Sequence, residues 1–194
     1  MTESEKNIRA FLAIEPPDDI LQILSRLQEE LKREISGRIS WTKPQGQHLT
    51  LKFFGDISTE DVNNIRAAVE NRTVSGQSLK LKIEKLGVFP DPRRPRIIWC
   101  GVLGDGEKLS LLQKQLETDF EGIGFPNEDR EFRAHLTLGR IKEPYGLTGI
   151  SEALTKHNAF AAGVFECRQL ILFQSKLLPQ GAVYTKLAEF KLKG

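Results

Sequence analysis

Apolar side chains recur along the chain at two spacings, and each spacing predicts a different kind of element. Leu24, Leu27 and Leu31 recur at intervals of three and four, which is typical of a helix with one buried face. Residues 79–83 instead alternate between apolar side chains and lysine, which indicates a strand with one solvated face. Asp18 or Asp19 is expected to cap the first helix.

The elements predicted in this way occur twice in the same order. An opening strand at 8–14 is followed by a helix (20–35), a strand (48–54), a helix (58–70) and two strands (79–89 and 97–103), and then by a helix (107–121), a strand (135–141), a helix (149–157) and two strands (160–173 and 182–192). Matching positions keep nearly one offset, since His48 and His135 lie 87 residues apart and Phe89 and Phe173 lie 84 residues apart.

This repeat predicts an α+β fold of two structurally similar, pseudo-symmetric lobes. Each lobe is expected to be a small, mostly antiparallel sheet with helices on its outer face, and the two to form one bilobal domain over residues 1–194. Because clefts between lobes are common ligand sites, the active site is expected between them. The alternative is an ordinary α+β domain in which similar elements recur by chance.

Composition narrows the class of protein further. The chain has 194 residues, 39% hydrophobic and 28% charged, which favours a globular protein over a disordered one. Its 28 Lys and Arg nearly balance 26 Asp and Glu, so nucleic-acid binding would require a local basic patch. Two cysteines, Cys100 and Cys167, exclude a four-cysteine zinc site, and buried reduced thiols are expected. With neither a signal-like N-terminus nor an apolar run of about 20 residues, a cytoplasmic protein without membrane contact is expected.

One tetrapeptide, His-Leu-Thr-Leu, is present twice, at 48–51 and at 135–138. The two copies contain two of the three histidines, and each copy occupies the same place in its series. Because strand side chains alternate between faces, the histidine and threonine of each copy project from one face and the leucines from the other. Each copy therefore presents an imidazole beside a hydroxyl on a strand.

Two imidazoles in one cleft can act as a general acid and a general base, because histidine titrates near pKa 6.5. The reaction that fits such a pair deprotonates one oxygen and protonates another on opposite sides of a central atom, as in-line displacement at phosphorus does. The hydroxyls of Thr50 and Thr137 would donate hydrogen bonds to the non-bridging phosphate oxygens. A strained cyclic phosphodiester suits this site because it opens without a metal.

Ordinary structural roles compete with this interpretation. For either tetrapeptide alone, a core or surface histidine beside a strand threonine is the more common explanation. The pair in matching positions favours catalysis instead. A metal site is the weaker interpretation, because the chain has no His-Glu-x-x-His motif, and neither a metal nor a cofactor is expected.

At these residues the chain resembles the two-histidine (2H) phosphoesterase superfamily, and within it the RNA 2′,3′-cyclic phosphodiesterases, also called 2′-5′ RNA ligases. The similar regions are the opening strand at 9–14, Trp41 with the block 48–55, the block 132–140, and the closing strands at 172–175 and Tyr184. The chain departs from the family pattern at Phe54, where leucine is common, and at Gly139, where alanine is common. Neither departure touches the histidines or threonines.

The resemblance implies a two-lobed fold and the metal-free hydrolysis of a 2′,3′-cyclic phosphate RNA end to a 2′-phosphate. It implies that His48 donates a proton to the departing 3′ oxygen and that His135 accepts one from water. The residues themselves leave this choice open, because the two motifs are alike. The resemblance also implies the reverse reaction, in which tRNA halves are joined through a 2′-5′ bond.

Four further side chains are candidates for substrate binding. Arg140 follows the second motif and could hold a phosphate oxygen, although a surface role is equally common. Trp41, Phe53 and Phe54 are candidate base contacts, although core packing is the more common role of such side chains.

Lys43, Arg93 and Arg94 are candidate contacts to an RNA backbone, although a solvated loop is the more common meaning of such charges. His157 lacks the Leu-Thr-Leu continuation, and we expect it to lie at a helix end and to be dispensable.

The expected partner is RNA with a 2′,3′-cyclic phosphate end, such as a tRNA fragment, and the chain is expected to be a monomer. Two other functions stay open. One is a non-catalytic module that binds RNA ends, which would not need an acid and a base. The other is a phosphodiesterase that acts on a small cyclic nucleotide.

Overall fold

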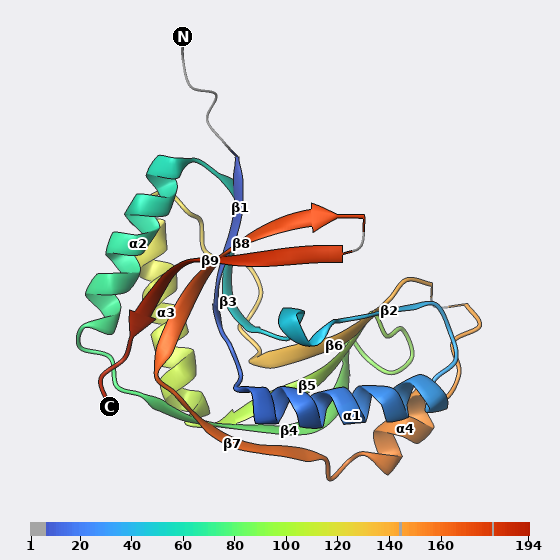
Figure 1. Ribbon diagram of the computed structural model, residues 1–194. Coiled ribbons are helices and arrows are strands. Elements are labelled where there is room, and N and C mark those ends of the chain that lie inside the picture. The colour runs from blue at the N-terminus through green and yellow to red at the C-terminus, as the bar shows by residue number, and fades with distance from the viewer. Residues whose placement is uncertain (1–6, 144, 180) are drawn as a thin grey trace.

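The computed structural model describes residues 7–143, 145–179 and 181–194, and the strands in these ranges form two antiparallel sheets (Figure 1). The first sheet has the order β3 (Leu49–Ile57), β1 (Ile8–Ile14), β8 (Gln169–Leu178) and β9 (Gly181–Lys191). The second has the order β2 (Ile39–Trp41), β6 (His135–Ile141), β5 (Ile97–Gly104), β4 (Leu79–Phe89) and β7 (Ala161–Cys167). The α+β fold with two sheet-based lobes is therefore confirmed.

Helices flank the two sheets. The described helices are α1 (Asp18–Glu34), α2 (Thr59–Thr73), α3 (Gly106–Glu121) and α4 (Ile150–Lys156), with a single 3-10 turn, η1 (Pro44–Gly46). Helices α2 and α3 pack side by side, with α2 against β9 and α3 against β4, while α1 packs against β7 and α4 (Figure 1). None of the described helices is long and apolar enough to cross a membrane.

The helix starts show which sequence signals acted as expected. Ser58 and Asp61 form a reciprocal capping box, in which the Asp61 backbone N–H donates to Ser58 Oγ at 3.1 Å and the Ser58 N–H donates to Asp61 Oδ2 at 2.9 Å. The expected cap of α1 at Asp18 or Asp19 is wrong, because Pro17 occupies the N-cap. Both aspartates lie in the first turn, where a negative charge still suits the helix dipole.

The two lobes do not correspond to the two halves of the sequence. Strands β1 and β3, from the start of the chain, form one sheet with β8 and β9, from its end, while the strands between them make most of the other sheet. Position by position, β3, β1, β8 and β9 match β6, β5, β4 and β7, and β2 is an additional strand beside β6. The pseudo-symmetry is therefore spatial, and the chain interleaves the two lobes.

Residues 160–173, expected as one strand, change sheets. Strand β7 ends at Cys167 and pairs with β4, whereas β8 begins at Gln169 and pairs with β1 and β9. Only Arg168 separates the two strands. One run of strand-forming residues therefore contributes to both lobes.

A β-bulge in β3 changes the direction of the side chains that follow the first motif. Thr50 and Lys52 pair with consecutive residues of β1, so Leu51 is an extra residue in the ladder. Lys52 consequently turns toward the core, with 4% of its surface exposed, and Phe53 returns to the face that carries Thr50. Simple alternation would have placed Lys52, not Phe53, beside the threonine.

Strand β6 carries the same irregularity at the matching place. Thr137 and Gly139 pair with consecutive residues of β5, so Leu138 is the extra residue. Arg140 therefore returns to the face that carries Thr137, where it is exposed. Both sheets thus present a third side chain beyond their His–Thr pair, Phe53 in one and Arg140 in the other.

A buried ion pair supports the motif strand from behind. Lys52 Nζ lies 2.7 Å from Glu117 Oε2 on α3 and donates to the Pro126 carbonyl oxygen at 2.6 Å. Gln113 Nε2 donates to Glu117 Oε1 at 3.0 Å, and the Glu128 backbone N–H donates to Glu117 Oε2 at 3.3 Å. The network joins β3 to α3 and to the loop that precedes β6.

Breaking this pair should destabilise the fold strongly. We expect Lys52→Met to lower the free energy of unfolding by about 3–5 kcal/mol, because Glu117 would remain buried without its partner. The double variant Lys52→Met with Glu117→Leu should recover part of the loss, because neither charge is then left unpaired. Urea denaturation of the variants measures both effects.

The exposed pair Lys32–Glu29 is the matched control, and Lys32→Met should change stability little. A Lys52→Met protein as stable as the wild type, or a double variant less stable than Lys52→Met alone, would contradict the role assigned to the pair.

Candidate active site

The two motif strands meet where the two sheets adjoin. Strands β3 and β6 belong to different sheets, yet they lie side by side with Cα atoms within 8 Å of each other. His48 immediately precedes β3, and His135 is the first residue of β6. The leucines of both motifs are at most 3% exposed, while both threonines are half-buried, as expected from strand alternation.

His48 is packed among aromatic rings. Its ring centroid lies 4.6 Å from that of Phe173, 5.1 Å from that of Tyr184 and 5.7 Å from that of Phe11. Tyr184 meets the imidazole edge-on, with an interplanar angle of 87°. Only 8% of the His48 surface is exposed, so the imidazole sits in a largely apolar pocket of the first sheet.

This burial lowers the pKa of His48 to about 4, because the apolar pocket disfavours the charged imidazolium. The Glu15 carboxylate opposes the shift, and the Lys186 ammonium adds to it. Glu15 and Lys186 form an ion pair with each other at 2.7 Å, so their effects largely compensate. His48 is therefore neutral at pH 7 in the free protein.

His135 has a defined tautomer. Its Nδ1 lies 2.6 Å from the backbone carbonyl oxygen of Arg133. Since a carbonyl oxygen only accepts hydrogen bonds, Nδ1 carries the proton, and in the neutral ring Nε2 keeps a free lone pair. Burial lowers the pKa of His135 and the charge of Arg140 lowers it further, while the bond to the Arg133 carbonyl raises it.

Both histidines rest against a phenylalanine that is itself stacked. Phe173 stacks on Phe11 with centroids 5.3 Å apart, and Phe89, which meets His135 edge-on at 5.1 Å, stacks on Trp99 at 4.9 Å. The motif analysis did not assign these rings to the site. The signal was present, however, because Phe89 and Phe173 lie 84 residues apart in matching strands.

The three candidate aromatic contacts separate. Trp41 and Phe54 pack on the hydrophobic core, Phe54 with its ring 4.9 Å from Phe120 and 5.1 Å from Phe125. Their expected contact with a base is therefore not supported. Phe53 is 56% exposed on the face that carries Thr50, and its ring lies 5.5 Å from that of Phe11.

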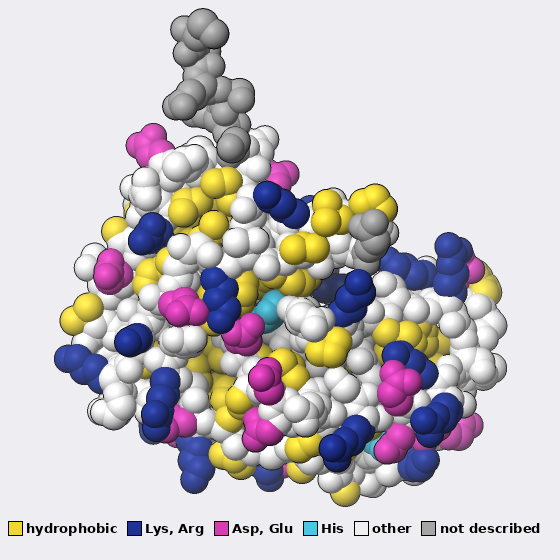
Figure 2. Space-filling model, viewed as in Figure 1, with side chains coloured by type: hydrophobic (Ala, Val, Ile, Leu, Met, Phe, Trp, Pro, Cys, Tyr) yellow, Lys and Arg dark blue, Asp and Glu magenta, His cyan; other side chains and the backbone are white. Residues whose placement is uncertain are grey.

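The candidate basic residues lie on loops. Arg93 and Arg94 are exposed in the loop that follows Phe89, the ring that contacts His135. Lys43 precedes η1, and its side chain reaches the turn between β8 and β9 near Gly181. The face of the molecule viewed in Figure 2 is hollowed beneath the projecting β8–β9 hairpin, and Lys and Arg side chains gather beside the hollow.

Other reactive groups stand apart from the motif strands. Cys100 and Cys167 are buried free thiols whose pKa values burial raises to about 12 and about 11, so neither is a nucleophilic thiolate near neutral pH. Among the described residues, the one group with metal-ligand spacing is Glu30, Glu34 and His157, on α1 and at the end of α4. His157 lies at that helix end as expected, 2.9 Å from Glu34 Oε2.

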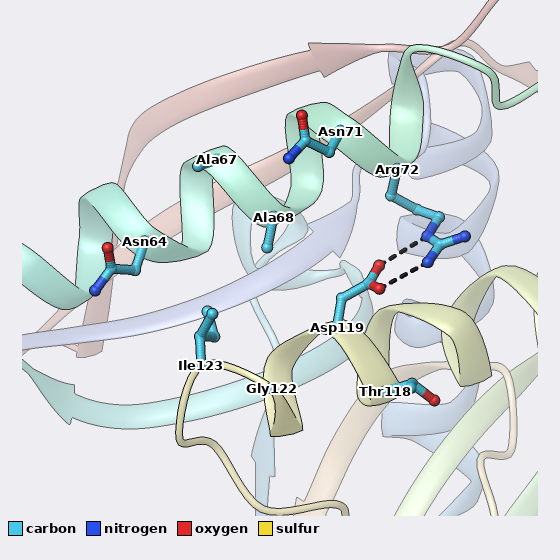
Figure 3. A pocket seen from close by; sticks show the side chains of 9 residues that line it. All are labelled: Asn64, Ala67, Ala68, Asn71, Arg72, Thr118, Asp119, Gly122 and Ile123. Atoms are coloured by element: carbon cyan, nitrogen blue, oxygen red, sulfur yellow. Dashed lines mark hydrogen bonds and ion pairs between the residues drawn. The ribbon is translucent and has the colours of Figure 1, made fainter.

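A groove between α2 and α3 is a different kind of feature. It has a volume of about 660 Å³, and a double hydrogen bond from Arg72 to Asp119, 2.7 Å in each arm, spans the two helices beside it (Figure 3). Its lining, from Asn64 to Ile123, contains none of the candidate catalytic residues. We therefore assign the candidate active site to the junction of β3 and β6.

Comparisons with known proteins agree on one family. The profile described as LigT like Phosphoesterase matches residues 14–99 and 103–184. An RNA 2′,3′-cyclic phosphodiesterase of Methanothermobacter thermautotrophicus is 32% identical over 95% of this chain and 99% of its own length. An enzyme of the same name from Aquifex aeolicus is 32% identical over 97% of this chain and 100% of its own length.

Solved structures show the same fold. A Thermus thermophilus protein superposes with a TM-score of 0.80 at 25% identity, covering 96% of this chain and 99% of that protein. Escherichia coli LigT, crystallised with 3′-AMP, superposes with a TM-score of 0.75 at 21% identity over 97% of this chain and 99% of its own, which is a likeness of fold. The chain belongs to the LigT-like phosphoesterase family.

Proposed function

We propose that the protein is an RNA 2′,3′-cyclic phosphodiesterase, which opens the cyclic phosphate at an RNA end and leaves a 2′-phosphate. The observation that carries the proposal is the pair of equivalent His–Thr motifs on two adjoining strands of different sheets. Relatives about one-third identical over nearly their full length bear this name. No step in the proposed reaction calls on a metal.

His135 is the general base in this mechanism. The Arg133 carbonyl holds its Nδ1 proton, so Nε2 is free to take a proton from the attacking water. The same contact orients the ring, much as a partner orients a catalytic imidazole in other acid–base sites. This tautomer distinguishes two motifs that are identical in sequence.

His48 is the general acid. Water attacks phosphorus from the His135 side, the bond from phosphorus to O3′ breaks, and His48 gives its proton to the departing O3′. Two proton transfers on opposite sides of phosphorus leave a 2′-phosphate and a free 3′-hydroxyl. An RNA 5′-hydroxyl in place of water would form a 2′-5′ bond by the same steps.

Thr50, Thr137 and Arg140 would hold the phosphate. All three lie on the motif-bearing face of their strands, Arg140 because of the bulge at Leu138. Hydroxyl and guanidinium groups donate to the non-bridging oxygens, where negative charge must be held during displacement. The bound anion would also raise the pKa values of both histidines, which supplies the protonated His48 that the acid role requires.

Replacing either motif histidine should abolish the reaction. We expect His48→Ala and His135→Ala each to lower kcat/KM on an RNA with a cyclic end by roughly 10²–10⁴-fold, because each removes one proton-transfer group. His157→Ala is the matched control and should retain wild-type activity. The rates, with analysis of whether the phosphate stays on the 2′ oxygen, measure both the role and the reaction.

Full activity in either motif variant would refute the acid–base pair. Tight binding of a cyclic end by the wild type without any product would favour a non-catalytic RNA-end binding module instead.

The pH dependence should differ between the free and the substrate-bound protein. Because burial lowers the pKa of both histidines, the singly protonated pair is most populated below pH 6.5, and kcat/KM should peak there and fall as pH rises. The profile of kcat should lie at higher pH, because the bound phosphate raises both pKa values. Initial rates from pH 4 to 9 separate the two profiles, and a kcat/KM still rising above pH 7 would contradict this account.

Acid should also destabilise the folded protein through His48. Its pKa is about 4 when folded and 6.5 when unfolded, so between these values only the unfolded chain binds the proton. Stability is therefore complete above pH 6.5 and falls by roughly 3 kcal/mol as pH drops to 4. Urea denaturation at several pH values should show a smaller loss for His48→Gln, and parallel curves for the two proteins would contradict the shift.

A further inference from the structure

A second groove opens beside the candidate active site, next to Phe53. It has a volume of about 510 Å³, within the range of small-molecule sites, and its lining runs from Lys52 to Phe54 and from Phe125 to Arg130. Phe53 is the most exposed phenylalanine of the described chain, at 56%. An aromatic ring held on a strand with one side open is a surface on which a flat apolar group can stack.

The far wall of this groove is tied to the core. The Pro126 carbonyl accepts a hydrogen bond from Lys52, and the Glu128 backbone N–H donates to Glu117, so both loop residues are held by the buried ion pair. Phe125 packs on Phe54 beneath the groove. The groove therefore exists without a ligand to shape it, and a ligand need not order the loop on binding.

The charges along the groove disfavour a phosphate. Beyond the paired Lys52, the lining carries two carboxylates, Glu128 and Asp129, and one guanidinium, Arg130. An RNA backbone would meet excess negative charge here. A nucleobase meets no such penalty, because it is uncharged and offers a π-face to Phe53.

The proposed reaction also decides which part of the substrate faces this groove. In-line attack places water on the His135 side of phosphorus and the departing O3′, with its ribose, on the His48 side. Phe53 lies on the strand that follows His48, and the ring of Phe11 contacts both, at 5.7 Å from His48 and 5.5 Å from Phe53. The ribose and its base therefore extend over the sheet that carries Phe53.

We propose that Phe53 and its groove form the subsite for the nucleobase of the nucleotide that bears the cyclic phosphate. This inference rests on the proposed phosphodiesterase function and adds a specificity-determining residue to it. Phe53 stacks on the base, while the histidines and threonines act on the phosphate. The subsite makes the protein prefer a nucleoside cyclic phosphate over the same cyclic phosphate without a base.

Two substrates that differ only in the base test the subsite. One is 2′,3′-cyclic AMP, and the other is a methyl riboside 2,3-cyclic phosphate, which keeps the ribose and the cyclic phosphate. Phe53→Ala should lower kcat/KM for cyclic AMP by roughly tenfold to a hundredfold, the usual effect of losing one stacking ring, and leave the base-free substrate unchanged. Phe53→Trp should retain the preference for cyclic AMP.

Leu111→Ala is the matched control, because Leu111 is 57% exposed on α3 and lines neither site. It should leave both rates unchanged. An equal loss on both substrates in Phe53→Ala would mean a structural role only, and no loss on either would mean no contact with the base. Either result overturns the subsite.

Calorimetric binding of 2′-AMP separates this inference from the proposed function. Phe53→Ala should weaken 2′-AMP by the same factor as it lowers kcat/KM and leave the affinity for inorganic phosphate unchanged. If the wild type hydrolyses neither substrate, the phosphodiesterase proposal fails, and affinity for 2′-AMP that depends on Phe53 still supports the subsite. Equal affinity of Phe53→Ala and wild type for 2′-AMP would overturn it.

Discussion

The contact between β3 and β6 is the constraint on which the site depends. Each strand is fixed within its own sheet, and only where the two sheets adjoin do the motifs come together. The bulges at Leu51 and Leu138 then decide which side chains accompany the histidines on this face. Lys52, turned inward by the first bulge, ties the same strand to α3 and to the loop before β6. Backbone irregularity thus serves both the site and its support.

Much of the architecture could be predicted from the chain, because local patterns report local structure. The leucine stripe of α1, the capping box at Ser58 and the inward leucines of both motifs all follow from spacing. Spacing does not report which sheet a strand joins. Residues 160–173 therefore looked like one strand, although the chain changes sheets at Arg168.

The candidate site was predictable in part for the same reason. Alternation predicts the face of Thr50, but a bulge cannot be predicted from alternation, so the orientations of Phe53 and Arg140 needed the pairing register. The two histidines are equivalent in sequence and different in place. One lies among aromatic rings that lower its pKa, and the other holds a backbone carbonyl that selects its tautomer. Neither difference is visible in a tetrapeptide.

The interleaved topology has a consequence for how the protein is made. Strand β8 brings Phe173 and strand β9 brings Tyr184 against His48, and both strands are synthesised after every other element of the described chain. A ribosome that has already translated both motifs therefore still carries a nascent chain without the wall around His48. Such a chain cannot complete its first sheet until the closing hairpin has left the exit tunnel. Assembly of the His48 pocket is thus a late event in biosynthesis.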